Sequence, residues 1–218
     1  MDYMARIMDN FVELHGDRVY GDDPSIVCGL GQIGGQTVVV IGQQRDQTLD
    51  STDEGSNART MPEGFRKAQR ALRIAEKFEL PVITLVDTPG ANLSSEAEER
   101  GLGHAIASTL ALISSLTVPT ISTIIGEGGS SGALALGIAD RVIMLENAIY
   151  SAVSPEEAAE LIYQDEEKAE EVVGSLRLTA RDCMEMEIVD QVVPEPSQGA
   201  HRDHHEASRL LKRALLQN

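Results

Sequence analysis

Short apolar runs that alternate with helical segments set the strongest limit on how this sequence can fold. The runs PVITLVD (81–87), PTISTIIG (119–126) and RVIMLE (141–146) are apolar along most of their length, as in strands buried on both faces. The segments between them, 97–116 and 131–139, have helical spacing or are rich in Ala and Leu. Strands that alternate with helices predict an α/β layered fold with both faces of the sheet covered. Since no linker interrupts residues 1–218, we expect one domain.

The N-terminal region predicts a helix followed by a β-hairpin. Apolar residues at helical spacing predict a short amphipathic helix over 3–14. The runs IVCGL (26–30) and TVVVIG (37–42) flank a Gly-Gly pair and predict two strands joined by a tight turn. The polar stretch 43–61 then predicts a long surface loop. Beyond residue 146 we expect helices, apart from one short strand over 188–193.

Composition excludes several classes of protein. The 18 Lys and Arg residues against 35 Asp and Glu residues give a net charge of −17, so we expect no nucleic-acid binding. No run of about eighteen apolar residues predicts a membrane span, and the N-terminus lacks the layout of a secretory signal. Cys28 and Cys183 are far apart, so neither a disulfide framework nor a four-cysteine zinc site is expected. We therefore expect a cytoplasmic protein with buried, reduced cysteines and no metal of its own.

A stripe of basic side chains lies on a helix that is predicted to begin at Pro62 and to end near Phe78. Arg66, Arg70 and Arg73 follow each other at offsets of four and three residues, which places them on one helix face. In so acidic a chain this clustering favours contact with a phosphate-bearing ligand or an acidic partner. A solvated helix face explains the same pattern, and the sequence leaves both interpretations open.

The segment GEGGSSGALALG (126–137) is the strongest local signal for chemistry. It connects a buried strand to a helix, and its glycines allow a ligand to approach the backbone closely. Unpaired N–H groups at the start of a helix, together with the helix dipole, can bind a phosphate or stabilise an oxyanion on a carbonyl. A tight turn with close helix–strand packing is the structural alternative.

The same segment also matches the GxSxG pattern of a nucleophile elbow. In that hypothesis Ser130 is the nucleophile, His201 is its base, and Asp140 or Asp190 orients the base.

The motif DTPG (87–90) is similar to the metal-side motif of GTP-binding proteins. A GTPase is excluded because the sequence has no GxxxxGK[ST] loop. What DTPG still predicts is a ligand-contacting glycine at the carboxyl end of a strand.

Taken together, these motifs resemble one family, the alpha subunits of bacterial acetyl-CoA carboxylase carboxyltransferase. The resemblance runs along nearly the whole chain in family order. It rests on ELHGDRVYGDDPSIV (13–27), PEGFRKA (62–68), EKFELPVITLVDTPGA (76–91), EERG (98–101), VPTISTIIGEGGSSGALALGIADRV (118–142), MLENAIYSAVSPE (144–156) and VVPEPSQGAHR (192–202).

The resemblance implies a crotonase-like fold, a superhelix of stacked ββα units. It also implies transfer of CO2 from carboxybiotin on a carrier protein to acetyl-CoA or another acyl-CoA, which gives malonyl-CoA for fatty acid biosynthesis within an ATP-dependent complex. In this family, oxyanion holes of backbone N–H groups stabilise the biotin enolate and the thioester oxygen, so no side-chain base is required. By motif, Gly128 and Gly129 supply the N–H groups on the biotin side. The residues that line the same biotin site are Gly90, Ala91, Ser130 and Gly132.

The partners that the resemblance implies are a zinc-ribbon beta subunit, a biotin carboxyl carrier protein and biotin carboxylase, with an α2β2 heterotetramer as the carboxyltransferase. The sequence departs from the family pattern at Asn92-Leu93, where an aromatic residue is usual, and at Ser131, where a glycine is usual. The loop 45–61 is acidic instead of basic. The family's long N-terminal helical region is not part of this sequence, so contacts between copies are expected to differ.

Three other functions stay open at this point. The first is a serine hydrolase of the same fold that uses Ser130. The second is a decarboxylase or transcarboxylase subunit that acts on malonyl thioesters, because it would stabilise the same intermediate. The third is a subunit that binds partners without catalysis.

Overall fold

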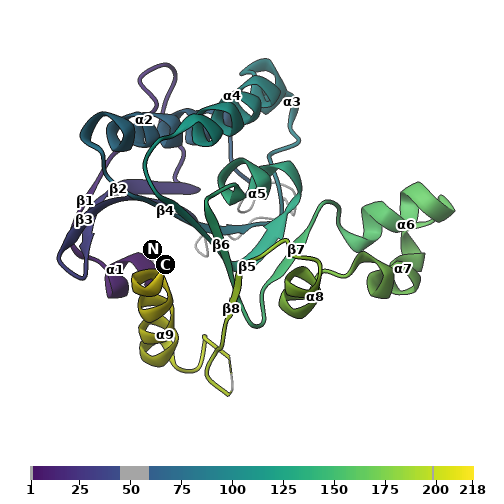
Figure 1. Ribbon diagram of the computed structural model, residues 1–218. Coiled ribbons are helices and arrows are strands. Elements are labelled where there is room, and N and C mark those ends of the chain that lie inside the picture. The colour runs from purple at the N-terminus through teal and green to yellow at the C-terminus, as the bar shows by residue number, and fades with distance from the viewer. Residues whose placement is uncertain (1, 45–58, 198) are drawn as a thin grey trace.

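A single mixed β-sheet forms the centre of the molecule (Figure 1). The computed structural model describes residues 2–44, 59–197 and 199–218, and within them the strand order is β1-β2-β3-β4-β5-β6-β8, with β7 beside β5. The first three strands are antiparallel, and the strands from β3 onward are parallel. The strands are β1 (Asp9–Glu13), β2 (Ile26–Ile33), β3 (Gln36–Gln43), β4 (Val82–Thr88), β5 (Thr120–Gly129), β6 (Arg141–Leu145), β7 (Ile149–Ser151) and β8 (Gln191–Val193).

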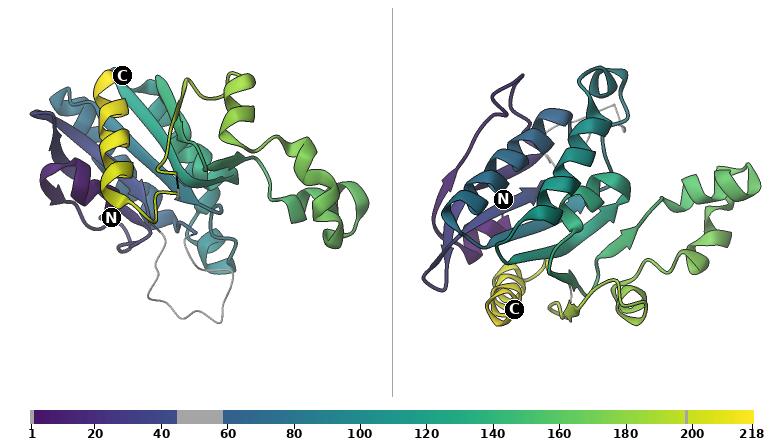
Figure 2. Two further views of the ribbon diagram at one scale, coloured as in Figure 1. Left: turned by 90° about the horizontal axis from the view of Figure 1, so that it is seen from below. Right: turned by 45° about the horizontal axis from the view of Figure 1, so that its top comes forward.

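Helices cover both faces of this sheet, which confirms the predicted α/β layers (Figures 1 and 2). Helices α2, α4 and α5 pack on one face, while α1 and α9 lie together on the other, near the two chain ends. The helices are α1 (Asp2–Ile7), α2 (Pro62–Phe78), α3 (Ser95–Glu99), α4 (Leu102–Ser115), α5 (Ser130–Gly137), α6 (Pro155–Tyr163), α7 (Ala169–Leu176), α8 (Ala180–Glu185) and α9 (His204–Gln217), with a 3₁₀ turn η1 (Glu166–Lys168).

Several sequence predictions are confirmed by these elements. The hairpin joins β2 to β3 through Gly34 and Gly35, both with positive φ, and α2 begins at Pro62 and ends at Phe78. Both cysteines are free and buried, and burial raises the pKa of the Cys28 thiol to about 11. A small side chain that stays protonated packs as an apolar residue in the core.

The helix predicted over 3–14 is wrong beyond Ile7. Asp9–Glu13 instead forms β1, which pairs antiparallel with β2. Asn10 has φ 53°, a left-handed conformation that cannot continue a right-handed helix. A Cβ on Gly29 would lie 2.1 Å from the Val12 carbonyl oxygen, so the glycine in β2 is what lets β1 approach. Tertiary strand pairing therefore overrides the helical spacing of the sequence.

The predicted helix 97–116 is also divided. It consists of α3 and α4, separated at Gly101, which has φ 80° and begins α4 as its N-cap. The short strand β7 was not predicted, and the strand expected over 188–193 is shorter, since β8 begins at Gln191. Most of the predicted loop 43–61 lies outside the described residues.

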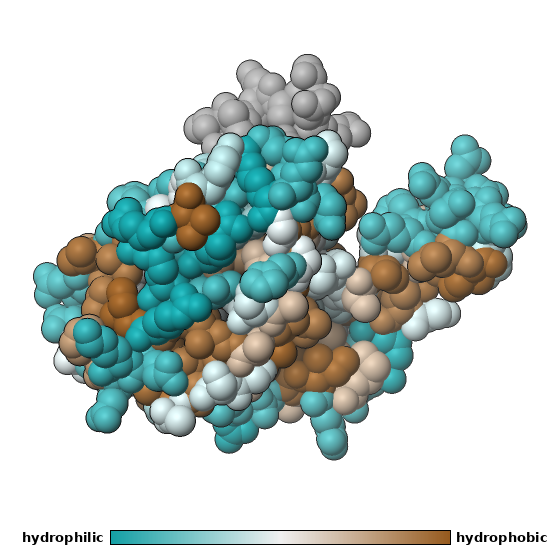
Figure 3. Space-filling view, turned by 90° about the horizontal axis from the view of Figure 1, so that it is seen from above, coloured by the Kyte–Doolittle hydropathy of each residue, from teal (hydrophilic) through white to brown (hydrophobic). Residues whose placement is uncertain are grey.

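Residues 155–176, here called the arm, project away from the sheet (Figures 1 and 2). The buried part of the arm is a small cluster of Ala158, Ala159 and Val172. Larger apolar side chains such as Leu161, 76% exposed, lie on its surface, and Figure 3 shows apolar residues gathered along one side of it. The arm therefore adds little to the main core. Among the helices described, none is long and apolar enough to cross a membrane.

Candidate functional site

The carboxyl ends of the parallel strands β3, β4 and β5 meet at one edge of the sheet. Val86 in β4 pairs with Ile124 in β5, and Thr88 at the end of β4 pairs with Gly128. Helix α5 begins directly after β5. Ligands of parallel α/β sheets bind at this edge, so the predicted glycine turn lies where a site is expected.

The glycine turn has an unusual backbone at its centre. Gly128 and Gly129 are the last residues of β5, which pairs with β7 through Tyr150 and Ser151 at this level. Ser130, the first residue of α5, has φ 53°, a conformation that costs energy for a residue with a side chain. A strained residue at a strand-to-helix turn is typical of a functional site, and here the strain turns the chain sharply into α5.

The glycines in this turn allow two backbones to touch. A Cβ on Gly129 would lie 2.3 Å from the Pro89 carbonyl oxygen, and a Cβ on Gly132 would lie 2.5 Å from the Gly90 carbonyl carbon. The segment that follows β4 therefore packs directly on the start of α5. The expectation that Gly129 is a glycine so that a ligand can approach it is corrected, because protein backbone occupies the space beside its Cα.

The first turn of α5 offers backbone N–H groups. The N–H groups of Ser130, Ser131 and Gly132 have no partner within the helix by geometry, and the N-cap Gly129 has no side chain that could cap them. No residue in the described part of the chain accepts a turn, loop or side-chain hydrogen bond from them. The helix dipole adds positive potential at the same point, so the turn can stabilise an anionic oxygen.

Gln43 brings a buried amide to this turn. It is the last residue of β3, is 4% exposed, and donates through Nε2 to the Gly132 carbonyl oxygen at 2.9 Å. Its Oε1 has no hydrogen-bond partner among the described residues. A buried amide oxygen without a donor is costly, so Gln43 has the capacity to accept a hydrogen bond from a ligand N–H or O–H.

Arg59 brings a guanidinium group to the same edge. The Arg59 Nη1 donates to the Ala91 carbonyl oxygen at 3.1 Å. The adjacent Thr60 forms an isolated parallel bridge with Ala91 and accepts a hydrogen bond from the Asn92 amide at 3.3 Å. Residues 59–61 therefore lie beside residues 90–92, between β4 and the start of α2.

Sequence reasoning found neither Gln43 nor Arg59. Gln43 ends an ordinary apolar strand, and Arg59 is one basic residue among several before a helix. The one local signal for Arg59 is its position three residues before Pro62, where a strand-to-helix connection returns to the carboxyl edge of the sheet. The predicted lining residues, by contrast, are brought together: Gly90 contacts Gly132, and Ser130 Cβ lies 3.7 Å from where a Cβ on Gly90 would be.

The catalytic triad considered for Ser130 is not assembled. Asp140 accepts hydrogen bonds from the amide and hydroxyl of Thr120, at the first residue of β5, and Ser130 follows the last residue of that ten-residue strand. The two ends of such a strand are about 30 Å apart. Asp190 pairs with Arg141 at the start of β6. No hydrogen bond between Ser130 and His201 is found in the described ranges. The prediction that Asp140 or Asp190 orients a base for Ser130 is therefore wrong.

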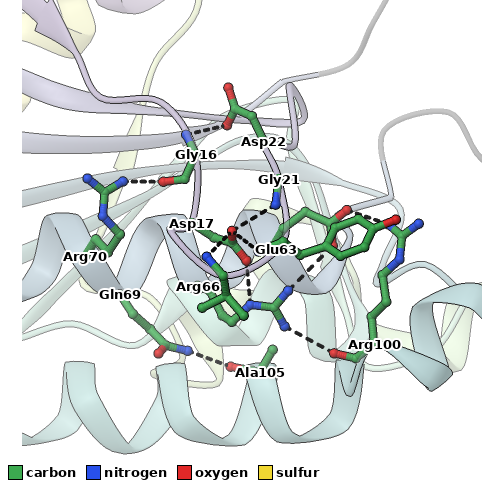
Figure 4. Close-up of polar contacts among 12 residues, drawn as sticks. Gly16, Asp17, Gly21, Asp22, Glu63, Arg66, Gln69, Arg70, Arg100 and Ala105 are labelled. Atoms are coloured by element: carbon green, nitrogen blue, oxygen red, sulfur yellow. Dashed lines mark hydrogen bonds and ion pairs between the residues drawn. The ribbon is translucent and has the colours of Figure 1, made fainter.

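The basic stripe on α2 is largely neutralised by the protein itself (Figure 4). Arg66 donates to the Asp17 carboxylate at 2.7 Å and to the Arg100 carbonyl oxygen at 3.1 Å. Arg70 donates to the carbonyl oxygens of His15 and Gly16. A phosphate contact by Arg66 or Arg70 would require these bonds to break. Arg73 is exposed, and for it the phosphate or partner contact stays a prediction.

The neighbouring buried charges show how tightly this network is satisfied. Lys67 is 1% exposed and pairs with Asp22 while donating to the Asp23 carbonyl oxygen at 2.7 Å. Burial by itself raises the pKa of Asp17, but hydrogen bonds from the three amides of residues 19–21 and from Arg66 outweigh it and lower the pKa to about 2. The network is therefore a structural clamp between α2 and the loop 14–25.

Comparison with known proteins agrees with this geometry. The model of the family described as "Acetyl co-enzyme A carboxylase carboxyltransferase-like" matches residues 1–218. The acetyl-coenzyme A carboxylase carboxyl transferase subunit alpha of Geobacter sulfurreducens is 48% identical over 211 residues, which are 97% of this chain and 66% of that protein. The subunit alpha of Treponema denticola is 44% identical over 218 residues, 100% of this chain and 72% of that protein. The chain thus spans about two thirds of the length of these relatives.

Solved structures show the fold. A transcarboxylase 12S structure covers 99% of this chain with a TM-score of 0.78 at 22% identity, over 40% of its own length. The beta subunit of geranyl-CoA carboxylase from P. aeruginosa covers 98% with a TM-score of 0.74 at 19% identity, also over 40% of its length. These neighbours confirm the crotonase-like α/β fold. With this fold and a family match along its whole length, the chain belongs to the acetyl-CoA carboxylase carboxyltransferase alpha-subunit family.

Proposed function

We propose that this chain is the alpha-subunit part of a biotin-dependent acyl-CoA carboxyltransferase that moves a carboxyl group from carboxybiotin on a carrier protein to acetyl-CoA and so forms malonyl-CoA. The observation that carries the proposal is the turn from β5 into α5, where N–H groups outside any ladder or helix bond face the carboxyl edge of the sheet. Backbone donors fixed in this way stabilise negative charge on a carbonyl oxygen without reorganising during the reaction.

The residues at this turn suit the ureido group of biotin. A ureido ring presents one carbonyl oxygen and N–H donors. The amides of the first turn of α5 can donate to the oxygen, and Gln43 Oε1, which is buried and has no partner in the described part of the chain, can accept from an N–H. When bound, carboxybiotin supplies the carboxyl group that is transferred. Gly128 and Gly129, which pair with β7, are still proposed as donors, and Ser130 and Ser131 at the start of α5 extend the proposed donor set by two residues.

Water exclusion and positioning are the other tasks proposed for this chain. Gly90 and Ala91 form one wall of the site because their backbone packs on Gly132. Thr88 Oγ1 donates to the Gly90 carbonyl oxygen at 2.8 Å and accepts from the Gly90 amide at 3.2 Å, which holds that wall in place. A rigid wall keeps the donors at a fixed distance from a bound oxygen, and such positioning is a large part of what an active site without a side-chain base can contribute.

A beta subunit is the first partner proposed, since the relatives carry the name subunit alpha. The biotin carrier protein, biotin carboxylase and an α2β2 assembly are proposed with it, as are a cytoplasmic location and a role in fatty acid synthesis. The coenzyme A site is proposed to lie mainly on the beta subunit.

Reconstitution tests the proposal. The chain is mixed with a zinc-ribbon carboxyltransferase beta subunit and carboxylated carrier protein, and malonyl-CoA formed from acetyl-CoA is measured. The variant Ser130→Ala keeps the amide at this position and removes only the hydroxyl. Because the amide is the proposed donor, we expect this variant to retain transfer to within about tenfold. Gly103→Ala, at an exposed helix position with no heavy atom within 4 Å of the added Cβ, is the matched control.

The other outcomes identify the competing functions. Loss of all activity in Ser130→Ala, together with labelling of Ser130 by a fluorophosphonate probe, would assign the chain to the serine hydrolases. Formation of a stable complex without any carboxyl transfer would make it a binding subunit. Turnover of malonyl-CoA without biotin would indicate a decarboxylase.

A further inference from the structure

The Arg59 guanidinium lies close to the N-terminus of α5, where the helix dipole already gives positive potential. Its guanidinium Nη1 is 3.0 Å from the position of a Cβ on Gly90, and Ser130 Cβ is 3.7 Å from the same point. The guanidinium and the first residue of α5 therefore face one spot above Gly90. A cation beside a helix N-terminus is unfavourable, because the helix dipole is positive there as well.

The Arg59 guanidinium forms no ion pair with another described residue, although Asp87 and Glu127 lie near the ends of the neighbouring strands β4 and β5. The first turn of α5 carries no acidic residue. The one hydrogen bond that Arg59 makes to described residues, to the Ala91 carbonyl oxygen, uses one of its five N–H donors. A guanidinium with donors left over among the described residues, close to the start of a helix, is suited to bind a carboxylate.

The backbone around Arg59 holds it in position. Thr60, which is 0% exposed, is fixed to Ala91 and Asn92, and Met61 donates its N–H to the Asp23 carboxylate at 2.8 Å. Arg59 is thus held on both the β4 side and the α2 side. An anchored guanidinium with free donors in a planar fork matches the two oxygens of a carboxylate.

We infer that Arg59 binds the carboxylate of the group that is transferred, and that it is a specificity-determining residue for carboxylated ligands at this site. The inference rests on the proposed function, because it assigns the anion to the carboxyl group of that reaction. The same carboxylate is carried first by biotin and then by the thioester, and Arg59 recognises the chemistry that both share.

Binding of two thioesters tests the inference directly. Malonyl-CoA and acetyl-CoA differ only in the carboxylate, so their affinity ratio for the complex with the beta subunit, measured by calorimetry, isolates that group. We expect Arg59→Met to lower this ratio about tenfold or more and Arg59→Lys to restore part of it, since a lysine keeps the charge and loses the fork. Arg181→Met, which removes an 88% exposed arginine from α8, is the matched control and should leave the ratio unchanged.

A second measurement distinguishes whether Arg59 binds the carboxylate on biotin or the carboxylate of malonyl-CoA. If Arg59 recognises the carboxylate on biotin, Arg59→Met raises the KM for carboxylated carrier protein relative to wild type. A purely structural role through the Ala91 bond would weaken both thioesters equally, as would a contact with a coenzyme A phosphate. The inference is overturned if Arg59→Met changes neither the malonyl-CoA to acetyl-CoA ratio nor the KM for carboxylated carrier. If the wild-type complex binds neither thioester, the proposed function itself fails.

Discussion

Helices α2 and α5 begin at the same edge of the sheet, but only the N-terminus of α2 has acidic side chains beside its first N–H groups. At α2 the chain supplies its own anions: the Asp23 carboxylate accepts from the Met61 amide, and Glu63 lies in the first turn. At α5 the cap is a glycine, the first turn has no acid, and the Arg59 guanidinium lies close by, against Gly90. A helix N-terminus whose positive potential is compensated by a carboxylate of the protein has a structural role, whereas one without such a carboxylate is open to an anionic ligand.

This difference explains why the basic stripe on α2 is a poor ligand site despite its charge. Arg66 and Lys67 face carboxylates of the loop 14–25 at close distance, so an incoming phosphate would have to compete with partners already in place. The first turn of α5 has no charged side chain, and no described residue accepts a turn or loop hydrogen bond from its first N–H groups. The number of basic side chains is therefore a weaker indicator of a ligand site than donors that lack hydrogen-bond partners within the described protein.

The largest effect on stability is expected when a side chain is added at Gly129, where the backbone of the turn touches the backbone of Pro89. In Gly129→Ala the added Cβ would lie 2.3 Å from the Pro89 carbonyl oxygen, and backbone cannot move aside as a flexible side chain can. We expect a loss of about 3 kcal/mol or more in the free energy of unfolding, measured by urea denaturation. Gly103→Ala should be neutral or stabilising by up to about 1 kcal/mol, because its Cβ meets nothing and alanine favours a helix. Equal stability of the two variants would show that the backbone contact is not tight.

A somewhat smaller effect is expected when the clamp at α2 is broken. Asp17→Ala leaves three backbone amides of residues 19–21 and the Arg66 guanidinium without their acceptor. We expect a loss of about 2–3 kcal/mol by urea denaturation, the usual cost of unsatisfied buried polar groups. Asp9→Ala is the matched control, because the Asp9 side chain is 70% exposed and its pair with Lys212 is 3.9 Å long. A change below about 1 kcal/mol in Asp17→Ala would remove the structural role.

Local sequence signals predicted the parts of this fold that depend on neighbours in the chain. Pro62 and an amphipathic face set the bounds of α2, and clustered glycines located the turn into α5. The signals failed where distant segments meet. The strand β1 depends on its pairing with β2, and Gln43 reaches a residue 89 positions further along the chain. Arg59 acquires a role only because the parallel strands bring residues 59–61 beside residues 90–92.

Acid should weaken the clamp at α2 in a defined direction. The folded-state pKa of Asp17 is lowered to about 2 from 3.8, so its contribution to stability is complete above about pH 4 and is lost as the pH falls towards 2. We expect the stability difference between wild type and Asp17→Asn to shrink by about 1 kcal/mol between pH 4 and pH 2.5. Urea denaturation at several pH values measures it. A difference that stays constant over this range would show that Asp17 is not held ionised by the fold.

The smallest change in stability comes from giving α5 the internal anion that α2 already has. Ser131 is exposed in the first turn of α5, so Ser131→Asp places a carboxylate next to unpaired N–H groups and the helix dipole. We expect a gain of about 0.5–1 kcal/mol in unfolding free energy, with a loss of carboxyl transfer because the new anion competes for the donors. Ser131→Asn, with the same shape and no charge, should keep more of the activity. If Ser131→Asp became more stable and stayed fully active, the start of α5 would have only a structural role, as the start of α2 does. The reacting oxygen would then have to be stabilised elsewhere.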